Sequence, residues 1–290
     1  MLTTILLLSI AINDPIIIAH RGASATLPEH TLEAYTLAYA QGADCIEPDV
    51  VLTKDHVLVC CHDLTVSNEA AMRELYPDRA RADGKWYVID FTLAELRAIG
   101  ETIGRNDPPL PGTTIATLDE MIKLVQRLNE RTGREVSIIP EPKKPSFHRA
   151  EGYDISAALV GTLRSHGYHW RGDGAIIQCF EVEALERMRL DFHCELRLVY
   201  LSSDPISDET LDHLATFADG IGPSRKLIED EGEAVDPGLV TRAHERGLAV
   251  YAWTFGTDAA MTDRFLHEYR VDGVFTDNPD VGVEVRDGVR

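Results

Sequence analysis

The sequence ADCIEPDVVLTKDHVLVCCH, residues 43–62, decides the fold. It contains two apolar runs, Ala43–Val50 and Val57–His62, and each run predicts a β-strand. The linker between them is only a few residues long, with Leu52-Thr53-Lys54-Asp55 at its centre. Two parallel strands need a connection of about a dozen residues or more, so Val57–His62 must return antiparallel, as the second arm of a hairpin.

Outside this stretch, short apolar runs alternate with segments of helical period from residue 16 onward. That alternation predicts a parallel sheet with helices packed outside it. With the hairpin arm set aside, eight parallel strands remain, which is the number in a (β/α)8 TIM barrel. Besides Ala43–Val50, the predicted barrel strands are Ile16–Ala19, Val136–Glu141, Ala175–Phe180, Leu196–Leu201, Gly220–Gly222, Leu248–Trp253 and Gly273–Thr276.

Helix start signals support this alternation. Thr92 with Glu95, and Thr117 with Glu120, form the capping-box pattern ahead of apolar runs, and the second of these helices is expected to end near Gly133. Further N-caps are expected at three aspartates, Asp154, Asp236 and Asp258.

One long polar segment, Asp63–Pro111, interrupts the alternation. It predicts an insertion over the C-terminal face of the barrel rather than a second domain. We therefore expect a single domain over residues 16–290, with the insertion at about residues 63–115. In barrels of this kind the loops after the strands build the active site, so the insertion is expected beside it.

The charge of the chain limits its partners. Its 290 residues include 28 Lys plus Arg and 48 Asp plus Glu, which gives a formal net charge of −20. This balance repels polyanions and argues against nucleic-acid binding, although a solvated acidic surface would have the same composition. An anionic substrate therefore needs cations placed locally.

The N-terminus carries a short apolar run, Leu2–Ala11, in which Ser9-Ile10-Ala11 resembles a cleavage site. No Lys or Arg precedes the run, and it is too short to span a bilayer. We expect residues 1–15 to be an apolar export leader, which would make the protein periplasmic or secreted. The alternative is an apolar start to the barrel of a cytoplasmic protein. No later segment approaches transmembrane length, so stable membrane insertion is not expected.

Carboxylates cluster at the ends of two predicted strands. Glu47 and Asp49 are two residues apart, so both side chains face the same way. Like charges side by side cost free energy unless a cation neutralises them, and oxygen ligands suit Mg²⁺ or Ca²⁺ rather than zinc. By the same alternation, Glu141 and Lys143 offer a third carboxylate and a cation for a phosphate. The alternative is that these are solvated groups at the rim.

Two imidazoles stand at comparable places. His20-Arg21-Gly22 follows the first strand, and this combination suits a phosphate oxygen because Arg donates two hydrogen bonds and Gly lets the backbone come close. His62 lies at the tip of the hairpin arm, from which it could act as a general acid or base. Each group could instead lie in an exposed turn. Their convergence at one rim favours function, because metal-assisted displacement at phosphorus uses such groups.

At these residues the chain resembles the glycerophosphodiester phosphodiesterase family. The similar motifs occur in the family's order over about residues 16–282: Ala19-His-Arg-Gly-Ala-Ser24, Leu27-Pro-Glu-His-Thr-Leu32, Glu47-Pro-Asp49, His62-Asp63, Pro140-Glu-Pro-Lys143, Trp253-Thr254 and Gly273-Val-Phe-Thr-Asp-Asn-Pro279. Within the insertion, Tyr76-Pro-Asp-Arg-Ala-Arg81 through Ile89-Asp-Phe-Thr-Leu93 resembles the bacterial periplasmic subtype.

The resemblance implies roles for nine residues. It implies that Glu47, Asp49 and Glu141 bind one divalent cation, and that His20 and His62 are the acid/base pair. It also implies that Arg21 and Lys143 contact the phosphate, that Trp253 lines the pocket for the glycerol end, and that Phe180 forms part of its apolar wall. Two positions depart from the family pattern, Cys179 and Phe255-Gly256, and both concern glycerol recognition rather than the metal set.

The sequence thus predicts a metal-dependent enzyme that hydrolyses small glycerophosphodiesters to sn-glycerol 3-phosphate and an alcohol, with Ca²⁺ or Mg²⁺ as cofactor. Two alternatives remain: a lysophospholipase D with the same site, and a catalytically silent barrel that only binds phosphodiesters. A silent protein would be expected to lose a carboxylate or an imidazole, and this chain keeps all of them. The sequence leaves a homodimer open.

Overall fold

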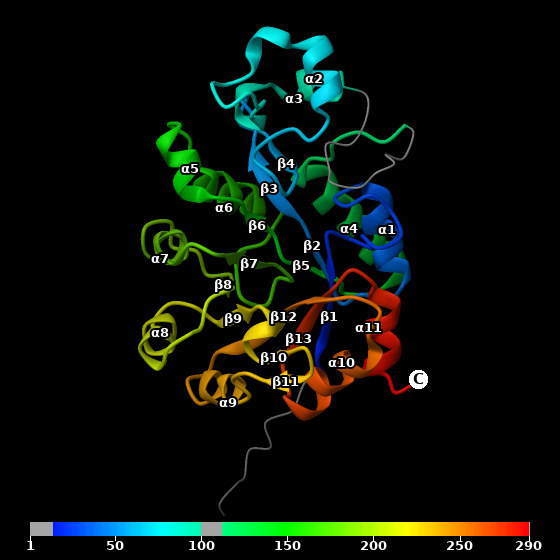
Figure 1. The fold of residues 1–290 in the computed structure, drawn as a ribbon, viewed down its shortest axis with the longest axis vertical. Coiled ribbons are helices and arrows are strands. Elements are labelled where there is room, and N and C mark those ends of the chain that lie inside the picture. Colours follow the sequence, from blue (N-terminus) through cyan, green and yellow to red (C-terminus); the bar gives the residue numbers. More distant parts are fainter. Residues whose placement is uncertain (1–13, 100–111, 290) are drawn as a thin grey trace, which may run out of the picture.

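The computed structural model describes residues 14–99 and 112–289, and its centre is a barrel of eight parallel strands (Figure 1). The strands follow the order β5-β2-β1-β13-β12-β9-β8-β7, and a parallel bridge between Ile138 and Ala175 joins the two ends of this sheet. The predicted (β/α)8 barrel is therefore confirmed. The strands are β1 (Ile16–His20), β2 (Cys45–Glu47), β5 (Ser137–Ile138), β7 (Ile176–Cys179), β8 (Arg197–Ser202), β9 (Gly220–Pro223), β12 (Ala249–Phe255) and β13 (Gly273–Thr276).

Two predicted strands are each split by a proline. Ala43–Val50 and Val136–Glu141 were expected to be continuous, but the ladders break at Pro48 and before Pro140, because proline has no N–H to donate. Beyond the breaks, β3 (Asp49–Leu52) pairs in parallel with β6 (Glu141–Pro142). On its other side, β3 pairs antiparallel with β4 (Leu58–Cys60), which confirms the predicted hairpin.

Helices surround the barrel on its outer side (Figure 1). The predicted capping boxes at Thr92 and Thr117 are both complete, and Asp154 and Asp258 accept hydrogen bonds from the first turns of their helices. The helices around the barrel are α1 (Leu32–Ala40), α4 (Leu118–Thr132), α5 (Pro145–Ala150), α6 (Ile155–Ser165), α7 (Val182–Leu190), α8 (Asp208–Leu214), α9 (Leu239–His244), α10 (Ala259–Asp263), which continues into the π-helical segment Arg264–Glu268, and α11 (Pro279–Arg286). Short elements between β9 and α9 are η3 (Arg225–Leu227), β10 (Glu229–Asp230) and β11 (Glu233–Ala234).

Helix α9 begins after Gly238, two residues later than the N-cap predicted at Asp236. The Asp236 carboxylate pairs with Arg242, whose Nη2 lies 2.8 Å from Oδ2. It also accepts from the backbone N–H groups of Gly238 and Leu239, so it still stabilises the start of this helix.

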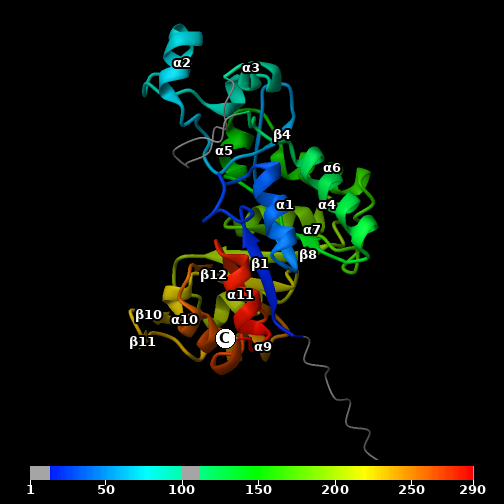
Figure 2. The ribbon, with the colours of Figure 1, turned by 90° about the vertical axis from the view of Figure 1, so that its right-hand side faces the viewer.

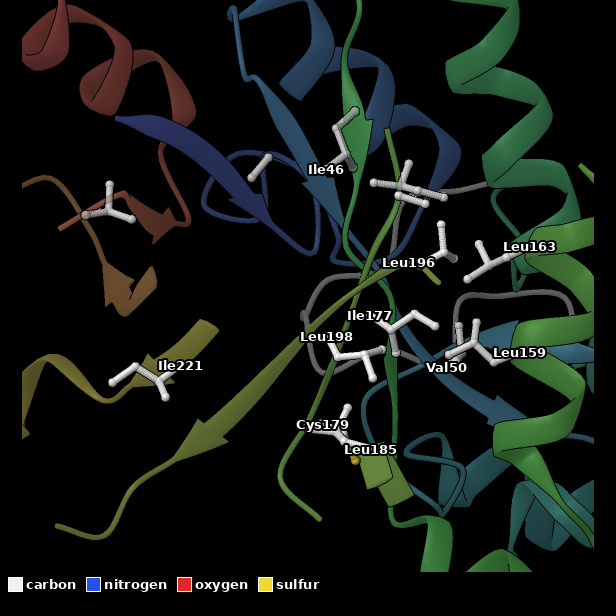
Figure 3. Close-up of a cluster of buried hydrophobic side chains, with 14 of the residues drawn as sticks. Ile46, Val50, Leu159, Leu163, Ile177, Cys179, Leu185, Leu196, Leu198 and Ile221 are labelled. Carbon is white, nitrogen blue, oxygen red and sulfur yellow. The ribbon is translucent and has the colours of Figure 1, made fainter. Parts of the chain in front are cut away.

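Alternation along each strand divides the apolar side chains into two layers. On β1, Ile18 belongs to the small cluster inside the barrel, whereas Ile17 belongs to the large cluster between strands and helices. Figure 3 shows part of the large cluster, in which Leu159 and Leu163 of α6 face the barrel beside Val50 and Ile177. Burial on both faces explains why the strand sequences are almost continuously apolar.

The insertion has a small core of its own on the outer face of the hairpin. Met72, Trp86 and Phe91 are buried there against Val51 of β3 and Val59 of β4. Figure 2 shows α2 (Glu69–Leu75) and α3 (Leu93–Arg97) standing beyond the hairpin at one end of the molecule. The remaining short helices of the insertion are η1 (Pro77–Arg79) and η2 (Val88–Asp90). The hairpin thus anchors the insertion beside the barrel opening.

The predicted leader, residues 1–15, falls almost entirely outside the described residues, so the domain start and export both stay predictions. Among residues 14–99 and 112–289, none of the helices combines the length and the apolar character that a membrane crossing would require.

Candidate active site

Three carboxylates converge at and just beyond the carboxyl ends of the barrel strands β2 and β5. Glu47, Asp49 and Glu141 each place an oxygen within 4.8 Å of the others, and their exposed fractions are 1%, 1% and 6%. The pairing of β3 with β6 sets Asp49 directly beside Glu141. The convergence predicted from side-chain alternation is present, and the split at Pro48 does not separate Glu47 from Asp49.

Two protein cations lie against this cluster. Lys143 Nζ is 2.7 Å from Glu141 Oε1 and 3.2 Å from Asp49 Oδ1. Arg21 Nε is 3.2 Å from Asp49 Oδ2, and the Arg21 backbone N–H donates to Glu47 Oε2 at 2.8 Å. Three carboxylates against two cations leave the group with one negative charge in excess when all five are ionised.

The pKa values show that the cluster is electrostatically unfavourable without a further cation. Burial, and then the charge of Asp49, raise the pKa of Glu47 well above its usual range and that of Glu141 to about 8. Asp49 differs: although burial opposes it, Lys143, His30 and Arg21 hold its pKa well below the usual range. Buried carboxylate oxygens at this spacing suit a divalent cation that prefers hard ligands, so the residues fit such an ion.

Each of the two predicted imidazoles is oriented by an aspartate. His20 Nδ1 lies 2.7 Å from Asp277 Oδ1, and His62 Nδ1 lies 2.8 Å from Asp63 Oδ1. Because an ionised carboxylate only accepts hydrogen bonds, each Nδ1 carries the proton and each Nε2 is left available for proton exchange. Burial, together with Lys143 and Arg21, lowers the pKa of His62 to about 4, against the opposing effect of Asp49.

A cavity of about 120 Å³, hereafter the inner cavity, opens beside these groups. All nine predicted site residues except Asp49 line it. On its apolar side, Trp253 and Phe180 meet edge to face with ring centroids 5.6 Å apart. Trp253 is held in place by its indole N–H, which donates to the Gly222 carbonyl at 2.7 Å. The structure therefore brings the whole predicted set into one site.

Comparison with known proteins places this site in a family. Residues 20–281 match the model of the glycerophosphoryl diester phosphodiesterase family. The chain belongs to this family. A protein of Haemophilus influenzae named glycerophosphodiester phosphodiesterase is 32% identical, and the alignment covers 96% of this chain and 91% of that protein.

Solved structures of this phosphodiesterase family share the fold. An Oleispira antarctica phosphodiesterase, solved in complex with the product sn-glycerol-3-phosphate, has a TM-score of 0.71 and 25% identity, and the match covers 94% of this chain and 97% of that one. A related protein of Silicibacter pomeroyi has a TM-score of 0.75 and 24% identity, covering 96% of this chain and 95% of that one.

Four residues of this phosphodiesterase-family site were given no role from the sequence. Glu29 accepts a hydrogen bond from Arg21 Nη1 at 2.7 Å, and Gln178 Nε2 donates to Glu47 Oε1 at 3.3 Å. The other two are His30 and Asp277. Glu29, His30 and Asp277 lie inside the motifs quoted above, and this position was the sequence feature that could have identified them as site residues. No spacing rule assigns their partners, because Asp277 is 257 residues from His20.

His30 holds one member of the carboxylate cluster, Asp49, through a hydrogen bond. It is buried, with Nε2 3.1 Å from Asp49 Oδ2 and Nδ1 3.0 Å from the Tyr35 hydroxyl. Since the Asp49 carboxylate only accepts, Nε2–H donates to Asp49 and the Tyr35 hydroxyl donates to Nδ1. Burial lowers the pKa of His30, which keeps the ring neutral in this arrangement.

The raised pKa of Glu141 predicts a pH dependence of stability in this phosphodiesterase-family chain when metal is removed. The native state binds the Glu141 proton more tightly than the unfolded state does, so the free energy of unfolding should fall as pH rises from about 4.5 to about 8. We expect the fall to be shallower in Glu141→Gln, which has no proton to lose. Denaturant unfolding in chelator at pH 5 and pH 8 measures both slopes, and equal slopes would contradict the prediction.

Proposed function

We propose that this chain hydrolyses glycerophosphodiesters to sn-glycerol 3-phosphate and an alcohol, with a divalent cation as cofactor. The observation that carries the proposal is the cluster of Glu47, Asp49 and Glu141 beside a cavity lined by two imidazoles, each of which contacts an aspartate. Family membership supports it, as does the product named for the Oleispira antarctica relative.

Glu47, Asp49 and Glu141 would hold the cation. Their oxygen ligands suit Ca²⁺ and Mg²⁺ alike. A cation bound there would lower the pKa of the attacking oxygen and offset charge on the phosphate. The backbone N–H of Arg21 and the side chain of Gln178 hold Glu47, and His30 holds Asp49, so the ligand oxygens are positioned before the ion arrives.

Arg21 and Lys143 would bind the phosphate oxygens. Although burial opposes it, Asp49 and Glu141 raise the pKa of Lys143, so the amine stays charged at neutral pH. Arg21 is held by Glu29 and Asp49, which leaves its guanidinium fixed at the cavity wall. Arg21 and Lys143 thus provide the local positive charge that an anionic substrate requires in a chain of net charge −20.

The imidazoles would exchange the protons. Of the inner cavity and the wider opening beside it, His20 lines the first and His62 lines both. His20 therefore takes the proton of the attacking oxygen, which belongs to water or to a glycerol hydroxyl. As the bond from phosphorus to the departing alcohol breaks, His62, protonated on both ring nitrogens, gives its Nε2 proton to that oxygen. A phosphodiester anion beside His62 would offset the effects that lower the pKa of its ring.

A coupled assay tests the proposal and the metal together. Chelated protein is expected to release no glycerol 3-phosphate from glycerophosphocholine, and adding back Ca²⁺ or Mg²⁺ separately should restore release. Lysophosphatidylcholine, in a parallel reaction, tests the lysophospholipase D alternative through choline release. Tight binding of glycerophosphocholine without any product, in the presence of either ion, would replace the proposal with the silent binding barrel.

A further inference from the structure

A second and larger opening adjoins the inner cavity. This opening, hereafter the outer groove, has a volume of about 630 Å³ and shares His62, Glu141, Lys143 and Phe180 with the inner cavity. A phosphodiester has two arms. If the function proposed above holds, the glycerol arm occupies the inner cavity beside Trp253, and the departing alcohol must extend past His62 into the outer groove.

Two lysines of the outer groove form no ion pair within the described residues, although the Asp83 carboxylate interacts electrostatically with Lys85. Lys85 comes from the insertion and Lys144 from the loop after β6, and both are exposed. Within residues 14–99 and 112–289, no ion pair joins either amine to a carboxylate within 4.0 Å, in contrast to Lys143. The groove therefore presents two amines that can bind an anion.

The carboxylates of the same groove are already engaged. Asp63 Oδ1 is bound to His62, as described above. Glu181 accepts two hydrogen bonds from Ser146, one from the backbone N–H and one from the hydroxyl, both at 2.8 Å. These hydrogen bonds use part of the accepting capacity of the two carboxylates, whereas an anionic head group would displace no ion pair at the lysines.

The aromatic rings of the groove also have cations beside them. The Arg81 guanidinium carbon lies 4.3 Å from the centroid of Tyr87, and Lys143 Nζ lies 5.8 Å from the centroid of Phe180. A cation already beside a ring weakens the attraction of that ring for a second cation, because like charges repel. These two rings therefore attract a quaternary ammonium less than free rings would.

We propose that the outer groove binds departing alcohols that carry an anionic group, a carboxylate or a phosphate, through Lys85 and Lys144. The substrates selected would be glycerophosphodiesters whose head group has a second negative charge. Cationic and neutral head groups are hydrolysed more slowly, because they make no contact with either amine.

Two substrate pairs isolate the anion. Glycerophosphoserine and glycerophosphoethanolamine differ only by a carboxylate. Bis(glycerophospho)glycerol and glycerophosphoglycerol differ by one glycerophosphate unit, so the rate for the first is expressed per terminal phosphodiester bond. For each pair the kcat/KM ratio at low salt is expected to be about fivefold or more in favour of the extra anion, as for two partly exposed ion pairs. The ratio should fall as salt is added. If only the first pair shows the preference, the groove binds a carboxylate, and if only the second pair shows it, the groove binds a phosphate.

Variants then assign the preference to the lysines. In Lys85→Gln/Lys144→Gln both ratios should fall to about one, and Lys144→Arg should keep the preference because it keeps the charge. The matched control is Lys54→Gln, an exposed lysine of the hairpin turn away from the groove, which should change neither ratio. Wild-type ratios near one, or ratios unchanged in the double variant, would overturn the inference. Failure to hydrolyse any of the four substrates would instead overturn the proposed function.

Discussion

Alanine at His20 or at His62 is expected to lower kcat by about 10²- to 10⁴-fold, because each ring moves one proton in the reaction. Both rings lie at the wall of the inner cavity rather than in the apolar core, so the fold should be retained. Glycerol 3-phosphate release measures the loss, and circular dichroism checks the fold. His169→Ala is the matched control, since His169 is exposed and lies away from the site.

A substrate with a better leaving group separates the two roles. Nitrophenolate departs without needing a proton, so a glycerophosphodiester of nitrophenol should restore much of the activity of His62→Ala. The same substrate should not restore His20→Ala, whose lost function is to accept a proton. Rescue of His20→Ala instead would reverse the assignment, and activity of both variants within tenfold of wild type on natural substrates would exclude an acid/base pair.

Glu47→Gln is expected to abolish binding of the divalent cation and to lower kcat by at least about 10²-fold, because the ion contributes several kcal/mol of charge stabilisation. The replacement keeps the size of the side chain. It removes a buried carboxyl group whose ionised form is already disfavoured, because burial and the charge of Asp49 raise its pKa. The metal-free protein should therefore remain at least as stable as wild type.

Unfolding with and without metal gives a readout that is independent of activity. A saturating ion, at about 100 times its dissociation constant, should stabilise the wild type by about 2.7 kcal/mol and Glu47→Gln by almost nothing. Glu209→Gln, on the exposed first turn of α8, is the control and should respond to metal as the wild type does. Equal stabilisation of all three proteins would show that the ion binds elsewhere.

Several parts of the fold followed from local rules. The short linker between Ala43–Val50 and Val57–His62 required an antiparallel return, and the β3–β4 pairing confirms it. Capping boxes at Thr92 and Thr117 were readable because both partners lie within one turn. The interruptions at Pro48 and Pro140 were missed, because the strands were predicted from their apolar pattern alone and the missing N–H of each proline was not taken into account.

The barrel, the hairpin and the residues of the acidic cluster could all be predicted from the sequence alone. These depend on alternation, on linker length and on the rule that parallel strands end at one rim, all of which act over a few residues. The partners became visible only in the folded chain: Asp277 for His20, His30 for Asp49, and the outer groove, whose two lysines form no ion pair with a described residue. Those contacts join segments far apart in the chain, and their geometry exists only once the barrel has brought the strand ends together.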